Sequence, residues 1–410
     1  MVRYREMVRF GVVNDTLVHY AALILRAQGA PEVVLIKNGK ELEQESINFY
    51  RNNITAKKID KFSYNIFWKS INTKLTGINK AYFSPDGVYN QLSLDALYNT
   101  ETKKYLADEI DIQLVVSTRD ILELNEVQQT TNFANFQAYL VGFPTYGTKN
   151  IAFDTKNITS DRAIQTNTTN QKTKQTLSRA MNFADVKDLP GTKTEIDNIN
   201  TIITQAKIKT TVLLEEKATE NSIKALKKPT ILHIATHGFF FPNPKEGLSD
   251  AFFDGLSADA LKKVTTNPLL RSGLLLAGCK QGILSKNTEN NTSNIIQEDG
   301  ILTAYETASL DLENTSLVVL SACETGLGEV VNGEGVFGLQ RAIKVAGAKS
   351  IIMSLWKVDD EASEKFMTAF YTNWITKKLS KRAAFRAAQT TIRQKYAAPL
   401  YWGAFVLVGE

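Results

Sequence analysis

Short apolar runs alternate with longer amphipathic stretches through the second half of the chain. The runs at 231–234, 317–320 and 351–353 are mostly apolar on both faces, as expected of buried strands. The stretch 360–376 repeats apolar residues at helical spacing, and a further helix is expected at 381–396. Strands that alternate with helices in this way predict an α/β fold with a mostly parallel sheet flanked by helices.

The first half carries weaker patterns. Residues 15–36 read as two apolar runs around the turn sequence Gln28-Gly29-Ala30-Pro31, which predicts a hairpin. Helices are expected between 40 and 80, and strands at 110–116 and 138–143.

Local signals mark helix starts and loops between these elements. Thr192-Lys193-Thr194-Glu195 matches a capping box, which predicts a helix from there to about Ala206. A second helix is expected from about Gly335 to Ala346, after a glycine-rich turn. The stretches 154–178 and 285–294 are polar, so we expect loops there.

Two of the buried strands end in residues with catalytic potential. The strings Ala235-Thr236-His237-Gly238 and Ser321-Ala322-Cys323-Glu324-Thr325-Gly326 follow those strands directly. Strand ends of this kind are where an open α/β sheet places its chemistry. Because the chain has only two Cys and three His, the pairing suggests a Cys–His nucleophilic site.

In such a site His237 would take the thiol proton of Cys323 and later give a proton to the leaving amine. The backbone N–H groups of Gly238 and Cys323 would form an oxyanion hole. Each residue also has an ordinary explanation, because a Cys after a strand is commonly a small buried residue and Gly238 suits a tight turn. His233, inside its strand, and Cys279 are expected to be structural.

Composition narrows the function classes. The chain has 410 residues, a net charge of +5 and 43% hydrophobic residues, typical of a globular protein of one or two domains. No apolar run is long enough for a membrane span, and the start of the sequence lacks a secretory segment, so we expect a cytoplasmic protein. The basic residues of the late helix are interpreted as a solvated face, so neither nucleic acid nor membrane is an expected partner. No zinc-ligand spacing, P-loop or dinucleotide motif is present, and neither a metal nor a cofactor is expected.

These motifs together resemble the CHAT domain family of caspase-like peptidases. The histidine block Leu232–Gly238 and the cysteine block Leu317–Gly338 resemble the family's two catalytic motifs. Four further blocks follow the family order, namely Ser272–Gly278, Asp299–Glu306, Ala346–Ala348 with Ser354–Asp360, and Tyr401–Phe405. The cysteine block lacks the Gln-Ala-Cys-x-Gly string of true caspases, so a preference for Asp at P1 is not implied.

The resemblance implies a caspase-like fold with His237 and Cys323 as its catalytic dyad. It predicts an N-terminal pseudo-protease half at 11–150 and a catalytic half at 185–410, joined by a polar linker at 151–184. The tetratricopeptide repeats common in the family are missing from the sequence, so residues 1–10 are expected to be either the remnant of an upstream region or the start of a short family member. The expected role is proteolysis in bacterial regulatory or defence signalling, with a regulatory protein partner.

In caspase-like folds the strand after the nucleophile strand borders the S1 pocket, so the resemblance implies that this strand affects substrate preference. Its end at Trp356 borders the expected S1 pocket, and Asp359, Asp360 or Asp299 would receive a basic P1 side chain. The alternative is that Asp359 and Asp360 stabilise the N-terminus of the next helix. Two functions from different classes stay open: a cysteine endopeptidase that cleaves a protein or peptide, and a catalytically silent scaffold that binds one. A transferase or esterase using Cys323 is a weaker third possibility.

Overall fold

The computed structural model of the chain describes residues 1–10, 13–121, 133–147, 186–241, 267–280, 299–322, 325–326, 329–331 and 335–409. The predicted nucleophile Cys323, the predicted linker 151–184 and the polar stretch 285–294 lie outside the described residues. Over the described ranges, no helix is both long enough and apolar enough to cross a lipid bilayer.

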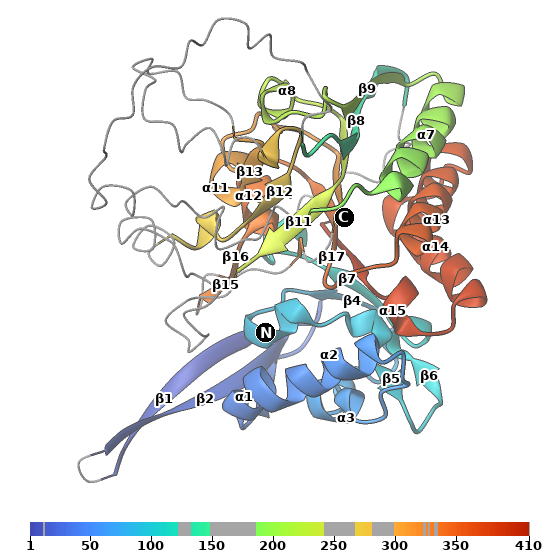
Figure 1. Ribbon diagram of the computed structural model, residues 1–410. Coiled ribbons are helices and arrows are strands. Elements are labelled where there is room, and N and C mark those ends of the chain that lie inside the picture. The colour runs from blue at the N-terminus through green and yellow to red at the C-terminus, as the bar shows by residue number, and fades with distance from the viewer. Residues whose placement is uncertain are drawn as a thin grey trace, which may run out of the picture.

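A central sheet organises the described part of the chain (Figure 1). Its eight strands are, in spatial order, β4 (Lys80–Phe83), β7 (Asp111–Leu114), β18 (Phe405–Val408), β17 (Ser350–Ser354), β14 (Leu317–Ser321), β10 (Ile231–Ala235), β8 (Gln137–Pro144) and β9 (Lys209–Glu215). Neighbouring strands are parallel, apart from the antiparallel pair β17 and β18. The predicted mostly parallel sheet is confirmed.

Helices cover both faces of this sheet (Figure 1). One face carries α7 (Pro190–Gln205), α13 (Asp360–Tyr371) and α14 (Lys381–Lys395), and the other carries α8 (Glu220–Lys224), α11 (Ala304–Thr307) and α12 (Leu339–Val345). Successive residues of a strand point to opposite faces. In β14, Leu317 and Val319 therefore join the first core, while Val318 and Leu320 join the second. Burial on both faces explains why these strands are apolar throughout.

The N-terminal region forms a separate layer, drawn below the central sheet in Figure 1. Strands β1 (Val2–Phe10), β2 (Val13–Ile24) and β3 (Glu32–Ile36) form an antiparallel sheet, so the hairpin predicted at 15–36 is confirmed. A third core lies between this sheet and its helices, and it includes the fully buried rings of Tyr20 and Tyr50. The helices of this layer are α1 (Gly39–Glu41), the π-helical turn η1 (Leu42–Ser46), α2 (Ile47–Thr55), α3 (Ser63–Phe67) and α4 (Lys69–Asn72).

Smaller elements complete the described fold. A three-stranded sheet follows β10 and contains β11 (His237–Phe240), β12 (Ser272–Leu275) and β13 (Ile301–Thr303). Two further pairs are β5 (Tyr98–Asn99) with β6 (Lys104–Tyr105), and β15 (Glu329–Val331) with β16 (Gly335–Phe337). The remaining helices are the 3-10 turns η2 (Gly87–Gln91), η3 (Leu94–Ala96), η4 (Leu106–Asp108), η5 (Phe133–Asn135) and η10 (Pro268–Leu270), the π-helical turn η11 (Thr372–Thr376), and α15 (Pro399–Trp402).

The predicted capping box at Thr192 is wrong. Helix α7 begins two residues earlier, at Pro190, because proline is well suited to the first helical position. The Thr192 hydroxyl donates to the Leu189 carbonyl and accepts from the Phe143 N–H instead. Glu195 is therefore released from the helix end, and its carboxylate points into the protein.

The helix expected from Gly335 to Ala346 is also only partly correct. Residues Gly335–Phe337 form β16, which pairs with β15, and α12 begins at Leu339. Gly338 has an extended backbone and ends the strand before the helix starts. A short hairpin therefore stands where the pattern predicted the first helical turn.

Strands from both predicted halves share the central sheet. Strand β8, from the segment 11–150, lies between β10 and β9 from the segment 185–410. Residues 2–10 of the predicted remnant form β1, which pairs with β2 along its length. The division into a pseudo-protease half and a catalytic half stays a prediction.

Candidate active site

An open pocket of about 660 Å³ lies where β10 and β14 end. These neighbouring parallel strands are in register, with Ala235 opposite Ser321, so both strands end at the same edge of the sheet. The pocket is lined by Val186, Lys187, Asp188, Leu189, Gly191, Thr192, Glu195, Thr236, His237, Ser321, Ala322, Lys357, Val358, Asp360, Ser363 and Phe405. The carboxyl edge of a parallel sheet is where α/β proteins bind their ligands.

His237 is the predicted catalytic residue that the structure places in this pocket. It is partly exposed and begins β11, two residues after β10 ends. Its ring Nε2 lies 2.8 Å from the carbonyl oxygen of Lys187, in the segment just before α7. Because a carbonyl can only accept, Nε2 carries the proton in this arrangement, and in the neutral ring Nδ1 is the acceptor.

Tyr146, which the sequence analysis missed, holds the backbone of His237. The Tyr146 hydroxyl accepts from the His237 N–H at 3.4 Å and lies 2.9 Å from the Thr236 hydroxyl, which in turn donates to the Leu275 carbonyl. The two rings also pack together, with centroids 5.3 Å apart. Burial raises the pKa of the Tyr146 phenol well above its usual value, so it stays protonated and donates to Thr236.

The end of β14 is fixed from the neighbouring strand β17. The Ser354 hydroxyl donates to the Ala322 carbonyl at 2.6 Å, and the Ser354 backbone N–H donates to the Thr325 hydroxyl. Gly326 N–H donates to the Ser354 carbonyl at 2.8 Å. Residues on both sides of Cys323 are therefore anchored to one serine, although Cys323 itself lies outside the described residues.

The four S1 candidates fall in different places. Asp360 lines the pocket, from the first turn of α13. Asp359 caps that helix, because its carboxylate accepts from the Ala362 N–H, so both Asp359 and Asp360 lie at the helix N-terminus as the alternative interpretation predicted. Trp356 packs against Tyr50, and its indole N–H donates to a backbone carbonyl.

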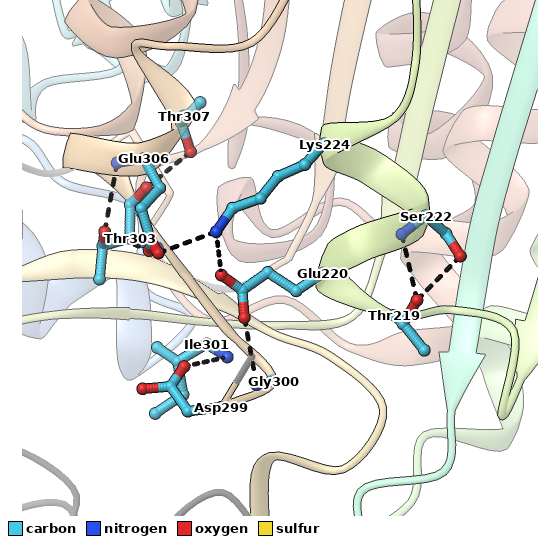
Figure 2. Close-up of polar contacts among 10 residues, drawn as sticks. All are labelled: Thr219, Glu220, Ser222, Lys224, Asp299, Gly300, Ile301, Thr303, Glu306 and Thr307. Atoms are coloured by element: carbon cyan, nitrogen blue, oxygen red, sulfur yellow. Dashed lines mark hydrogen bonds and ion pairs between the residues drawn. The ribbon is translucent and has the colours of Figure 1, made fainter. Parts of the chain in front are cut away.

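Asp299 belongs to a polar cluster beside α8 (Figure 2). Its carboxylate accepts from the Ile301 N–H at 3.0 Å. In the same cluster Lys224 lies between Glu220 and Glu306, at 2.5 and 3.0 Å. Glu220 also accepts from the Gly300 N–H, which ties the start of β13 to α8. The contacts of Asp299 thus anchor a turn.

The second cysteine, Cys279, differs from a catalytic thiol. It is fully buried, and burial raises the pKa of its thiol to about 12. A thiol with so high a pKa is a poor nucleophile at neutral pH. The expectation that Cys279 is structural agrees with this environment.

Glu195 is the second residue that sequence reasoning did not place in the site. Glu195 is 2% exposed and is one of the residues that line the pocket. One carboxylate oxygen lies 2.8 Å from Nε2 of His233 and the other accepts from the Ser321 hydroxyl at 3.0 Å. His233 is packed inside its strand, as expected, and its Nδ1 lies 3.2 Å from the Tyr371 hydroxyl.

The chain is similar in sequence to curated proteins over a short segment of each. Tetratricopeptide repeat protein 28 of Homo sapiens is 33% identical over 112 residues, and that of Mus musculus is 33% identical over 113. Each match covers 27% of this chain and 4% of the relative, so the similarity spans a small part of those proteins.

Solved structures with a related arrangement are peptidases and peptidase complexes. The Arg-specific cysteine proteinase gingipain R has a TM-score of 0.41 and 11% identity, covering 90% of this chain and 75% of that chain. The Porphyromonas gingivalis RgpB complex of pro- and mature domains gives 0.44 and 8%, covering 91% and 76%. The Saccharomyces cerevisiae separase–securin complex gives 0.41 and 11%, covering 80% and 15%.

A family model describes most of the sequence. The model of the CHAT domain matches residues 63–410, a range that contains the pocket, both strand ends and all of the predicted site residues. The order of the motifs and the α/β sheet agree with that match. The chain belongs to the CHAT domain family.

Proposed function

We propose that this chain is a cysteine endopeptidase with a caspase-like mechanism, in which Cys323 is the nucleophile and His237 the general base and acid. The observation that carries the proposal is the shared pocket. His237 and Ala322, the residue bonded to Cys323, line the same cavity at the ends of two strands in register. Because Cys323 follows Ala322 directly in the sequence, its thiol is the group that we assign to this cavity.

The hydrogen bond from His237 to Lys187 supports the chemical roles. With Nε2–H held by the Lys187 carbonyl, Nδ1 is left to accept the thiol proton. As sulfur bonds to the substrate carbonyl carbon, that proton moves to the imidazole. It then passes to the amine nitrogen as the C–N bond breaks, which leaves a thioester that water hydrolyses.

The ladder between β11 and β12 supports the proposed oxyanion hole. In an antiparallel pair, hydrogen-bonded and non-bonded positions alternate. The Phe241 N–H donates to the Arg271 carbonyl at 2.7 Å, and this phase puts Gly238 at a non-bonded position opposite Leu274. We propose that the N–H groups of Gly238 and Cys323 stabilise the oxyanion.

The proposed preference for a basic P1 side chain is assigned to Asp360. This carboxylate lines the pocket, whereas Asp359, next to it, caps the helix. Exchanging Asp360 for Asn should lower kcat/KM for substrates with Arg or Lys at P1 about 10- to 100-fold, because a hydrogen bond to a charged partner is lost. Substrates with apolar P1 residues should be cleaved as before. A peptide panel that differs only at P1 measures the effect.

The matched control is Asp359→Asn, which removes the same charge from the adjacent position. Asn caps a helix about as well as Asp, so neither stability nor P1 preference should change. A wild-type preference for Asp or an apolar P1 residue would refute the basic pocket. So would equal losses in the two Asn variants.

A thiol-reactive peptide probe tests the proposed activity itself. The probe should label the wild type and Cys279→Ser, but not Cys323→Ala, and His237→Ala should be labelled far more slowly. Since the chain has only two cysteines, these variants account for every thiol. Equal labelling of the wild type, Cys323→Ala and His237→Ala would rule out the peptidase and favour the peptide-binding scaffold.

We further propose a protein substrate and a regulatory protein partner in the bacterial cytoplasm. The low cysteine count supports a reducing compartment. A proteome-wide search for new termini that the wild type generates and Cys323→Ala does not would identify the substrate. The same experiment would report the residues at P1 directly.

A further inference from the structure

A chain of four buried polar side chains from four elements runs from the pocket wall, which includes Glu195 and Ser321, to His233 and Tyr371. Glu195 comes from α7, His233 from β10, Ser321 from β14 and Tyr371 from α13. His233 and Tyr371 are fully buried, and Glu195 and Ser321 are 2% and 7% exposed. Glu195 lies at the centre, within hydrogen-bond distance of both strands.

A carboxylate in such a place is costly unless it is fully hydrogen-bonded. The loss of contact with water opposes the charge, and good hydrogen bonds within the protein are needed to offset that penalty. Here the two oxygens are used separately: Oε1 accepts from the His233 ring and Oε2 accepts from the Ser321 hydroxyl at 3.0 Å. Each strand thus supplies one donor, and the carboxylate joins the two strands side by side.

Both strands lead directly to the proposed catalytic residues. Ser321 precedes Cys323 by two residues, and His233 precedes His237 by four. Helix α7, which carries Glu195, also begins just after Lys187, whose carbonyl holds the His237 ring. One carboxylate is therefore connected to each part of the proposed site through a few residues of chain.

Helix α7 lies unusually close to the sheet at this point. Gly142 of β8 faces Ile196, the neighbour of Glu195, and a Cβ on Gly142 would lie 2.5 Å from Ile196 Cγ1. The absence of a side chain at Gly142 lets the helix approach until Glu195 reaches His233. This close approach of α7 to the sheet agrees with a function that needs the Glu195 carboxylate within hydrogen-bond distance of the two strands.

We propose that Glu195 is a positioning residue, which holds the ends of β10 and β14 through His233 and Ser321 so that His237 and Cys323 stay at reacting distance. This inference rests on the proposed peptidase function. A direct contact of Glu195 with the substrate is disfavoured, because its side chain is almost fully buried and both oxygens have partners. The carboxylate acts on the reaction only through the two strands.

Two variants test the proposal at different strengths. Glu195→Gln keeps the shape of the side chain but loses its charge and one acceptor, while Ser321→Ala removes a single hydrogen bond. We expect kcat to fall about 10- to 100-fold in Glu195→Gln, since small displacements of reacting groups have effects of this size, and less in Ser321→Ala. KM should stay unchanged. The alkylation rate of Cys323 by iodoacetamide, followed by mass spectrometry, should fall in parallel.

Ser350→Ala is the matched control for Ser321→Ala. Ser350 is a buried serine at the opposite end of the neighbouring strand, where its hydroxyl accepts from Lys381. Loss of the Ser350 hydroxyl should lower the melting temperature about as much as Ser321→Ala does. It should not change kcat or the alkylation rate of Cys323.

Three results would distinguish the positioning role of Glu195 from direct substrate contact and from a failure of the proposed peptidase function. Glu195→Gln with a lower melting temperature but normal kcat and alkylation rate would overturn the positioning role and leave the peptidase intact. A higher KM confined to substrates with a basic P1 residue would overturn it in favour of direct substrate contact. A wild type that cleaves no peptide would refute the proposed function, while the alkylation rates would still test whether Glu195 positions the thiol.

Discussion

Exchanging His237 for Gln should lower kcat/KM for peptide cleavage about 100- to 10,000-fold, the range that general acid–base catalysis contributes. Gln can still donate toward the Lys187 carbonyl, which now accepts from the His237 ring, but its amide cannot take the thiol proton. The loss should appear in kcat, because the imidazole acts on the reacting atoms. Steady-state kinetics with a peptide substrate over a range of pH would measure it.

The pH profile carries the sharper test of the same variant. Without a neighbouring base, the thiol ionises only near the pKa of about 8.5 of an ordinary cysteine. Residual activity of His237→Gln should therefore rise steadily into alkaline solution, above the range where the wild type works best. His19→Gln is the control, since this histidine lies in the N-terminal sheet. A His237→Gln enzyme with wild-type kcat and pH profile would remove the imidazole from the mechanism.

The position of His237 could be predicted from sequence, whereas its partners could not. The apolar run before it predicted a buried strand, and the register of β10 with β14 then brought the two motifs to one edge. The Lys187 carbonyl that holds the ring is a backbone group, and any residue type supplies the same oxygen. Tyr146 lies far from His237 in sequence, and only the fold brings its hydroxyl to the His237 N–H.

Glu195 shows how a local pattern can mislead. Thr192 and Glu195 have the spacing of a capping box, and both side chains are used in tertiary contacts instead. The capping-box pattern considers only the unpaired N–H groups at the start of the helix. It contains no information about donors from the sheet that compete for the same side chains. Among the S1 candidates, Asp359 and Asp360 are adjacent and chemically equal. They differ only in their position relative to the start of α13: Asp359 caps the helix, and Asp360, in its first turn, lines the pocket.

Exchanging Arg382 for Met should lower the free energy of unfolding by about 1.5 to 3 kcal/mol, because a largely buried guanidinium loses its hydrogen bonds to a carboxylate and a backbone carbonyl. The Arg382 side chain is 7% exposed and joins α14 to β7. Its guanidinium donates to the Asp111 carboxylate at 2.9 Å and to the Ile112 carbonyl at 2.7 Å. Urea unfolding at neutral pH, followed by circular dichroism, would measure the loss.

The same interaction predicts a dependence on pH. Burial opposes ionisation of Asp111, but the Arg382 and Arg386 guanidiniums outweigh it and hold the pKa of the Asp111 carboxyl below its usual value. A carboxyl whose pKa is lower in the folded state stabilises the protein above the pKa of about 3.9 of the unfolded chain. That contribution disappears as the pH falls through the folded pKa. The gap between wild type and Arg382→Met should therefore narrow below about pH 4.

Arg386→Met provides the matched control, one helical turn further along α14. Arg386 contacts the same Asp111 oxygen at 2.7 Å, but its side chain is 33% exposed, so solvent screens the pair. Its loss should cost about 1 kcal/mol or less. Because β7 comes from the first third of the chain and α14 from the last, a large difference between the two variants would show that buried charge joins these segments. Equal small losses would mean that apolar packing alone holds α14 on the sheet, and the argument from desolvation would fail.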